Sequence, residues 1–543
     1  METKKKFKIS IILECTYVSK SIFELVHSLK ENPNLDINFI LVPSNRKIYH
    51  SNLSYFKKIY NTINYAAWDL IQYLEGIYFK QYHEDYSKYH INFSDQNHVL
   101  NLQKNFEAEK VFSAAMEEIL EDLNIDLMIA LNMNPYCLSL KKFSKLGLIF
   151  FGDYKSENGL CSPLGFNEVY KEISKTGFSI LRIKKNLDNF ETIFRGAFPT
   201  HNYFLANHLN IIKRRNFYLK KYIFLILSKA LPEDEIETYA AKDFGNFYLP
   251  PNIFMQSFYI FKSIRRRFAS LRNDILKKEK FWKVGYTFSD WTNFRDKQIH
   301  LIENPTNSYL ADPFVLNVEN KNYLLAEDYN FDSGKGVIVA YELQGKNSRR
   351  IGKVIEEPFH MSFPFLFKFQ EKIFMLPETS ENNDIRIYES VKFPNVWKLN
   401  HVIMKNVFAV DSMIFNFQDQ WWLLSNINPE QGPDGCSELC IYSSDNPLSG
   451  QWEPHQQNPV IVNSDKARNG GILFKDNKIY RVSQKQTFGR YGGEFTINEI
   501  IKLTKSEFVE KKIIHVKPNF IKKGLATHHC NSNNEITVFD FLT

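Results

Sequence analysis

Polar and acidic residues recur at a fixed spacing in the second half of the chain. Four pairs are each separated by 15 residues: Asp312 and Glu327, Phe363 and Glu378, Asp411 and Asn426, and Asn469 and Gln484. The two ends of an antiparallel hairpin lie side by side, so such pairs are expected to meet at one edge. Several carboxylates gathered there would supply a general base and a general acid.

These pairs belong to a repeat, which predicts the elements that position them. Copies of an Ala-Asp-Pro-Phe-Val-Leu … Tyr-Leu-Leu-Ala-Glu pattern occupy 311–327, 362–378 and 410–426, and looser copies occupy 467–484 and 527–540. Each copy predicts a strand, a polar turn and a second strand. Short strands repeating every 40 to 60 residues are typical of β-propeller blades. Five copies therefore predict an all-β five-bladed propeller over 281–543.

The first half has a different pattern. Strands are predicted at Phe7–Leu13, Ile37–Val42, Ile125–Leu131 and Leu148–Phe151, and helices at Ser21–Leu29 and Phe106–Leu123. Strands that alternate with helices indicate an α/β domain with a parallel or mixed sheet, which we place at 1–245.

A helical segment separates the two halves. Between Asn252 and Lys280, apolar residues recur every three or four positions beside a basic face with Arg265, Arg266 and Arg267. The favoured interpretation is a helical linker over 246–280. The alternative is a basic amphipathic helix on a membrane surface.

Composition excludes several classes of protein. The net charge of +7 arises from 68 basic and 61 acidic residues mixed along the chain, which argues against a nucleic-acid partner. The apolar run after the basic N-terminus is too short for a signal peptide, and no run reaches 18 apolar residues. Six scattered cysteines favour a reduced, cytoplasmic protein.

The C-terminal half also resembles known families. Ala311-Asp-Pro and its blades resemble glycoside hydrolase family 43. Ser362-Phe-Pro-Phe, Phe393-Pro-Asn-Val-Trp397 and Pro447-Leu-Ser-Gly-Gln-Trp-Glu-Pro-His455 are more similar to the propeller domain of the glucosamine inositolphosphorylceramide transferases of plants and their bacterial relatives. The resemblance covers about 281–543 and is more specific for the fold than for the reaction.

The family 43 resemblance implies roles for two aspartates. Asp312 matches the general base and Asp411 the later Asp that tunes pKa and orientation, but Arg468-Asn469 stands where the acid is expected. Glu378 or Glu327 remains able to supply a proton. A sugar carried on a phosphate needs a cation for the leaving group instead of an acid, and Arg468 suits that role.

We therefore expect a glycosyltransferase that acts in surface polysaccharide or glycoconjugate biosynthesis at the mouth of the propeller. The alternatives are a family 43-like glycosidase and a non-catalytic carbohydrate-binding protein. Expected partners are an activated sugar donor and a glycan or glycolipid acceptor, in the cytoplasm or at the inner face of its membrane.

The predicted catalytic residues are Asp312, Asp411 and Glu378, and the predicted substrate-binding residues are Glu327, His360, Arg468, Gln484 and His528. For some of these, structural roles stay open. Glu327 and Glu378 could hold blade edges together, Arg468 could only pair with Asp411, and His360 could only pack. Neither a cofactor nor a metal is expected, because the His and Cys residues lack paired zinc-site spacing.

The N-terminal half resembles a formyltransferase domain at Asp126-Leu-Met-Ile-Ala-Leu, Lys145-Leu-Gly-Leu-Ile-Phe-Phe-Gly-Asp153 and Thr176 to Asp188. The resemblance implies a Rossmann-like sheet. The Asn and His that formyl transfer requires are missing before Gly152-Asp153, and the Gly expected after Asp188 is missing too. We predict a domain that has lost the reaction. The favoured interpretation of Gly152-Asp153 and Glu168 is that they shape a loop, and the alternative is that they bind another ligand.

Overall fold

The computed structural model describes residues 6–43, 54–80, 88–91, 99–102, 112–132, 135–153, 163–187, 189–231, 237–240, 250–275, 281–427 and 434–543. The chain divides into two compact units, Met1–Ser270 and Leu271–Thr543. The division falls inside helix α9 (Ile253–Ile275), in the region for which the sequence predicted a helical linker.

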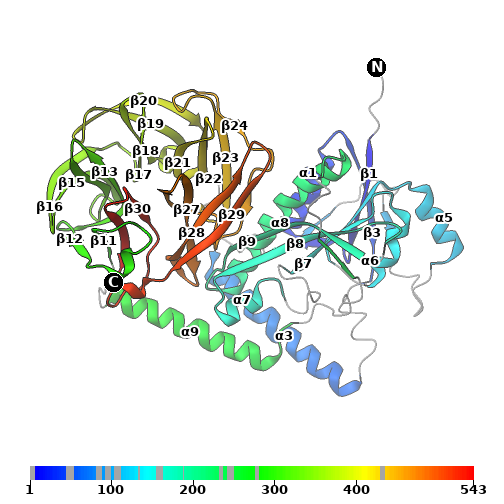
Figure 1. Cartoon of the computed structure of the whole chain (residues 1–543). Coiled ribbons are helices and arrows are strands. Elements are labelled where there is room, and N and C mark those ends of the chain that lie inside the picture. Colours follow the sequence, from blue (N-terminus) through cyan, green and yellow to red (C-terminus); the bar gives the residue numbers. More distant parts are fainter. Residues whose placement is uncertain are drawn as a thin grey trace. The chain divides into compact units, whose positions relative to one another are not determined.

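An eight-stranded mixed sheet forms the first unit, in the order β10-β9-β8-β7-β6-β1-β3-β5 (Figure 1). Its parallel strands are β5 (Val99–Asn101), β3 (Leu35–Leu41), β1 (Phe7–Leu13), β6 (Leu127–Ala130) and β7 (Leu148–Asp153). Its antiparallel strands are β8 (Lys175–Ile183), β9 (Asn189–Pro199) and β10 (Glu237–Ala240). The apolar run of β1 is buried on both faces, as a central parallel strand requires. The predicted Rossmann-like class is confirmed.

Helices accompany this sheet: α1 (Lys20–Lys30), α3 (Tyr55–Tyr78), α5 (Ala114–Asp122), α6 (Pro135–Leu140), α7 (Phe166–Lys171) and α8 (Phe204–Leu227). Strands β2 (Tyr17–Ser19) and β4 (Lys88–His90) form a separate ribbon. The Ser113 hydroxyl caps α5 by accepting the N–H of Met116. The beginning of the predicted helix Phe106–Leu123 lies outside the described residues. No helix in the described part of the chain is both long and apolar enough to span a bilayer.

The second unit is the predicted five-bladed propeller (Figure 1). Four blades follow one another along the chain. The first consists of β13 (Ser308–Val318), β14 (Lys321–Asn330), β15 (Lys335–Gln344) and β16 (Asn347–Ile355), and the second of β17 (Ser362–Phe369), β18 (Lys372–Glu378), β19 (Asp384–Lys392) and β20 (Val396–Lys405).

The third blade consists of β21 (Ala409–Phe417), β22 (Gln420–Ile427), β23 (Glu438–Ser444) and β24 (Glu453–Pro454), with β25 (Ile461–Val462) beside β23. The fourth consists of β26 (Asn469–Lys475), β27 (Lys478–Thr487), β28 (Arg490–Leu503) and β29 (Phe508–Val516).

The fifth blade closes the ring with strands from both ends of the unit. It contains β30 (Cys530–Ser532), β31 (Thr537–Leu542), β11 (Trp282–Thr287) and β12 (His300–Ile302). Strand β11 pairs with β31 from Trp282 opposite Leu542 to Thr287 opposite Thr537. This pairing joins the beginning of the propeller to its end.

Strands β13, β17 and β21 each contain a bulge at the same place. The register shifts between Ala311 and Phe314, between Ser362 and Phe365, and between Val410 and Met413. Asp312, Phe363 and Asp411 then adopt left-handed backbone angles, with φ of 49°, 45° and 48°. A bulge turns a side chain out of the regular alternation of its strand. Asp312 and Asp411 thus occupy equivalent bulges in the first and third blades.

Candidate functional site

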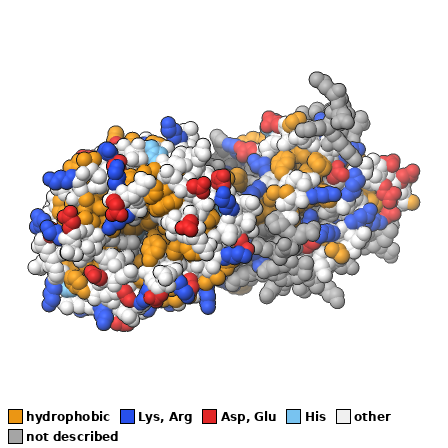
Figure 2. Space-filling view, turned by 45° about the horizontal axis from the view of Figure 1, so that its top comes forward, with side chains coloured by type: hydrophobic (Ala, Val, Ile, Leu, Met, Phe, Trp, Pro, Cys, Tyr) orange, Lys and Arg blue, Asp and Glu red, His pale blue; other side chains and the backbone are white. Residues whose placement is uncertain are grey.

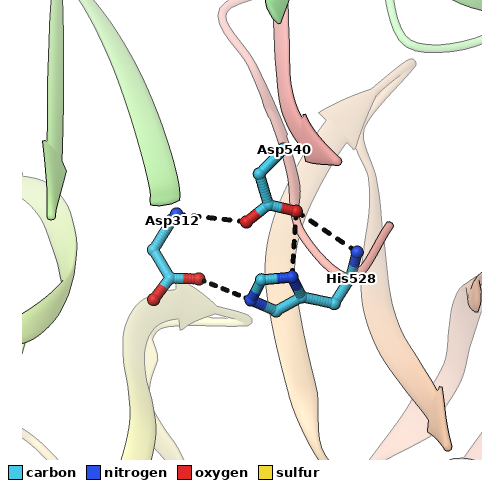
Figure 3. A group of neighbouring side chains, drawn as sticks. All are labelled: Asp312, His528 and Asp540. Carbon is cyan, nitrogen blue, oxygen red and sulfur yellow. Dashed lines mark hydrogen bonds and ion pairs between the residues drawn. The ribbon is translucent and has the colours of Figure 1, made fainter. Parts of the chain in front are cut away.

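The imidazole of His528 lies between two carboxylates (Figure 3). Its Nε2 is 3.1 Å from Oδ1 of Asp312, and its Nδ1 is 3.0 Å from Oδ1 of Asp540. Burial disfavours the charged ring, but Asp540 and Asp312 raise the pKa of His528 to about 10. An imidazole with a carboxylate at each nitrogen carries both protons, so His528 is a cation at neutral pH.

The carboxylate of Asp540 holds this arrangement together. Its Oδ2 accepts the backbone N–H of Asp312 at 3.1 Å, and its Oδ1 accepts those of His528 and His529 at 3.2 and 3.1 Å. The side chain of Asp540 is fully buried, whereas that of Asp312 is 10% exposed. Asp540 is therefore a structural anchor, and Asp312 is the member of this group that solvent reaches.

Asp312 is held as a carboxylate. Burial favours its neutral form, but the hydrogen bond and charge of His528, with further contributions from His529 and Arg468, lower its pKa below the usual value. A group that stays ionised is ready to accept a proton.

Arg468 pairs with Asp411 in the same cluster. Its Nε donates to Oδ2 of Asp411 at 2.6 Å, its Nη2 is 3.8 Å from Oε2 of Glu378, and its guanidinium lies 4.8 Å from the ring centre of Tyr491. Gln484 donates to the same Asp411 oxygen at 3.0 Å. Burial opposes the charge of Arg468, but Asp411 and other neighbours raise its pKa, so it remains a cation. This is the ion pair that the structural interpretation of Arg468 anticipated.

Glu327 is the protonated member of the cluster. It lies opposite Ala311 in the hairpin of β13 and β14, next to Asp312. Burial and the charges of Asp312 and Glu378 raise its pKa well above the usual value, which favours the protonated form of Glu327.

His360 lies close to Glu327, and both side chains lie next to Gly336. Its Nε2 lies 3.6 Å from Oε1 of Glu327, and its Nδ1 accepts the N–H of Gly336 at 2.8 Å. A Cβ on Gly336 would lie 2.5 Å from the carbonyl oxygen of Met361 and 2.7 Å from Oε1 of Glu327. Only glycine therefore permits this approach.

Three side chains at the ends of second strands also tie neighbouring blades together. Asp540 accepts the backbone N–H of Asp312 at 3.1 Å, and Glu378 accepts that of Asp411 at 3.4 Å. Asn426 accepts the backbone N–H of Asn469 at 2.8 Å. Glu378 thus makes the blade-edge contact that was its structural interpretation, and it also lies beside Arg468.

All eight predicted residues lie in this one cluster. Asp411 is close enough to Arg468, Glu378 and Asp312 for their charges to shift its pKa. Burial, opposed by Arg468, and these neighbouring carboxylates raise the pKa of Asp411. The cluster contains two cations, Arg468 and His528, and five acidic side chains: Asp312, Glu327, Glu378, Asp411 and Asp540. The lowered pKa of Asp312 favours a base, and the raised pKa values of Glu327 and Asp411 favour an acid in the same cluster. Such a pair is the requirement for acid–base chemistry.

Oxygen and nitrogen atoms of Asp312, His528 and Asp540 all lie within 4.8 Å of one another, close enough to suggest a metal site. However, an imidazole that is protonated on both nitrogens has no lone pair to offer a metal. The three residues fit a cation between two anions better than they fit a metal site.

Sequence reasoning missed four residues of the cluster. The rings of Trp282 and Tyr491 flank His528 with centroids at 4.2 and 5.3 Å, and burial and nearby Glu327 raise the pKa of Tyr309. Asp540 ends the fifth copy in the column of Glu327 and Gln484, and this position was the signal that could have found it. The three aromatic residues lie outside the repeated pattern.

In the first unit, Gly152 and Asp153 end β7, and Glu168 lies in α7. Asp188 lies outside the described residues. The formyltransferase likeness and the loop-shaping role of Gly152-Asp153 and Glu168 stay predictions.

Comparisons with known proteins bear on the propeller. Residues 298–538 match the family model described as glucosamine inositolphosphorylceramide transferase 1, N-terminal. The protein of that name from Oryza sativa subsp. japonica is 36% identical over 212 residues, which are 38% of this chain and 28% of the rice protein. The protein of the same name from Arabidopsis thaliana is 35% identical over 214 residues, which are 38% of this chain and 28% of the Arabidopsis protein.

Solved structures include a family 117 glycoside hydrolase from Zobellia galactanivorans (11% identity, TM-score 0.32, 48% of this chain and 90% of that one). A thermostable family 43 glycoside hydrolase is 12% identical with a TM-score of 0.33, and the match covers 44% of this chain and 86% of the hydrolase chain. The chain spans about 28% of the length of the curated relatives it matches. Its propeller resembles the N-terminal domain of the glucosamine inositolphosphorylceramide transferases.

Proposed function

We propose that this chain is a glycosyltransferase of glycoconjugate biosynthesis, and that transfer takes place at the propeller cluster with Asp312 as general base. The observation that carries the proposal is that one buried cluster holds both Asp312, paired with His528, and the cation Arg468, paired with Asp411. The match of residues 298–538 to a transferase family supports the same reaction class.

The chemistry follows from these charges. An acceptor hydroxyl gives its proton to Asp312 while its oxygen bonds to the anomeric carbon of the donor sugar. The bond from that carbon to the leaving phosphate oxygen breaks, and the phosphate departs with the electron pair. Arg468 offsets the departing negative charge, so no acid is required. His528 keeps Asp312 in the form that accepts the proton.

The proposed substrates are an activated sugar and a glycan or glycolipid acceptor. The name of the relatives contains glucosamine and inositolphosphorylceramide, and we propose a phosphoinositol-containing glycolipid as the acceptor here. We place the reaction in the cytoplasm, where activated sugars are made. Acceptors with a free hydroxyl on a phosphoinositol headgroup are therefore the first to assay.

The test is incubation with a panel of sugar nucleotides and glycolipid or glycan acceptors, with products detected by mass. The expected result is an acceptor that is heavier by one sugar residue. In Asp312→Asn, transfer should fall by at least about 10²-fold because the proton acceptor is gone, and circular dichroism should show that the propeller is still folded. Asp332→Asn, at an exposed position of the same blade, is the matched control. Full activity of Asp312→Asn would refute the mechanism.

A second candidate, a family 43-like glycosidase, is favoured by the proton that Glu327 retains. Hydrolysis needs an acid for a poor leaving group, and Glu327 fits that need. Sugar released from aryl glycosides without an acceptor, and lost in Glu327→Gln, would select hydrolysis over transfer. Saturable glycan binding without turnover of any substrate would select a carbohydrate-binding protein.

A further inference from the structure

Helices α3 and α9 cover one core cluster of the first unit. Trp68 of α3 and Tyr259 of α9 are buried there with Phe166 and Phe204. Gln256 of α9 donates to the side chain of Asn64 of α3 at 2.9 Å. Both helices bury one face in this cluster, and both run along the bottom of Figure 1.

The outward face of α9 carries a row of phenylalanines. Phe254, Phe258, Phe261 and Phe268 are 81, 49, 60 and 68% exposed. Their spacings of four, three and seven residues place them along one side of the helix. Four large aromatic side chains in a row are much more than the scattered apolar residues of an ordinary surface.

Helix α3 carries a matching row. Phe56, Ile63, Leu70 and Leu74 are 82, 59, 56 and 55% exposed, at spacings of seven, seven and four residues. Together with the α9 phenylalanines they form an outward apolar surface, which we call the α3–α9 face.

Basic residues accompany the apolar row on α9. Residues 253–270 contain Lys262, Arg265, Arg266 and Arg267 and no acidic residue. The Arg265 side chain is 64% exposed, and the Lys262 ammonium lies 5.3 Å from the ring centre of Phe258. The acid nearest to these groups is Glu172, which is 3.9 Å from Arg265 and 3.4 Å from Arg266.

We propose that the α3–α9 face binds the surface of an anionic membrane. The phenylalanines enter the boundary between headgroups and acyl chains, and the arginines extend to the lipid phosphates. A second copy of the chain fits this face less well. A twofold contact would bring the basic groups of the two copies together, and the single Glu172 of each copy is shared among Lys262, Arg265 and Arg266. The proposal does not depend on the glycosyltransferase assignment.

The test is sedimentation of the full chain with vesicles of phosphatidylcholine alone or with about 30% phosphatidylserine. The wild-type chain should bind the anionic vesicles, and binding should weaken as salt is raised. Phe254→Ser combined with Phe261→Ser should lower the partition coefficient by at least about tenfold. Arg265→Glu combined with Arg267→Glu should remove the preference for phosphatidylserine. Phe474→Ser, which changes a phenylalanine that is 45% exposed in the propeller, is the matched control.

Circular dichroism checks that each variant is folded. Three results would overturn the proposal: no binding of wild type to anionic vesicles, undiminished binding of the double phenylalanine variant, or equal loss of binding in Phe474→Ser. Size-exclusion chromatography supplies a fourth. A dimer that the phenylalanine substitutions dissolve, with no vesicle binding, would assign the face to self-association and refute the lipid partner.

Discussion

His528 lies between two carboxylates that differ in their other contacts. Asp540 also accepts three backbone N–H groups, whereas Asp312 faces solvent with part of its side chain. The positive charge of His528 therefore has its chemical effect on Asp312, whose pKa it lowers. The Asp312 base is present above that pKa, and it is lost as the pH falls through it.

We predict that His528→Gln raises the pKa of Asp312, because the neighbouring cation is gone. The acidic limb of the profile of kcat/KM against pH should then move to higher pH by at least about one unit. A purely structural loss would lower activity at every pH without moving the limb. His515→Gln is the control, since His515 pairs with Glu494 at 2.8 Å elsewhere in the propeller. An unmoved limb in His528→Gln would contradict the assignment.

At the scale of elements, the ends of second strands hold the bulges of neighbouring blades. Asn426 is fully buried, accepts the N–H of Asn469 at 2.8 Å, and donates to the carbonyl oxygens of Glu438 and Ala467 at 2.9 and 2.8 Å. Asn426→Ala removes all three hydrogen bonds, and of the two carbonyl oxygens that of Ala467 still accepts from Arg481. The loss should lower the free energy of unfolding by about 2–4 kcal/mol.

Urea denaturation measures this difference. Asn416→Ala, at an exposed position of β21 in the same blade, should change the free energy of unfolding by less than about 0.5 kcal/mol. Equal effects of the two substitutions would show that the contact between blades is not what stabilises the bulge.

Strand β15 sets the position of two site residues through Gly336. In Gly336→Ala, the added methyl must displace Glu327 or His360, because the carbonyl of Met361 on its other side belongs to the backbone. We expect turnover to fall by about tenfold or more, with a smaller loss of stability. Gly450→Ala adds a methyl where no atom lies within 4 Å, and should leave turnover unchanged. Unchanged turnover in Gly336→Ala would remove Glu327 and His360 from the site.

The predictability of each element follows from its pattern. The blades were found because apolar strand residues and the columns of Asp312 and Glu327 recur with one period. Helices α3 and α8 were not predicted. Helix α8 is buried almost all round, so it has no polar face to reveal a helical period, whereas α3 exposes the apolar residues Phe56, Ile63 and Leu70 instead of burying them. The contact of Asp540 with the bulge of Asp312 depends on ring closure, which no local pattern encodes.

At the scale of the whole molecule, the second unit contains every residue of the candidate site. We predict that a fragment 271–543 unfolds in one cooperative thermal transition, followed by circular dichroism. A fragment 271–536 should lack that transition, because it loses β31 and with it the partner of β11 and the anchor Asp540. A cooperative transition in the shorter fragment would show that the fifth blade is not required to close the ring.

The pairing of β11 with β31 also has a consequence for biosynthesis. Domains fold as their chain emerges from the ribosome, beginning with the N-terminal part. The first blades can form while translation continues, but Trp282 must wait for Leu542, which lies 260 residues later in the sequence, before its sheet is complete. His528 and Asp540 emerge just as late. The cluster therefore assembles only after the fifth blade has been synthesised, and a chain that stops short of β31 cannot hold His528 against Asp312.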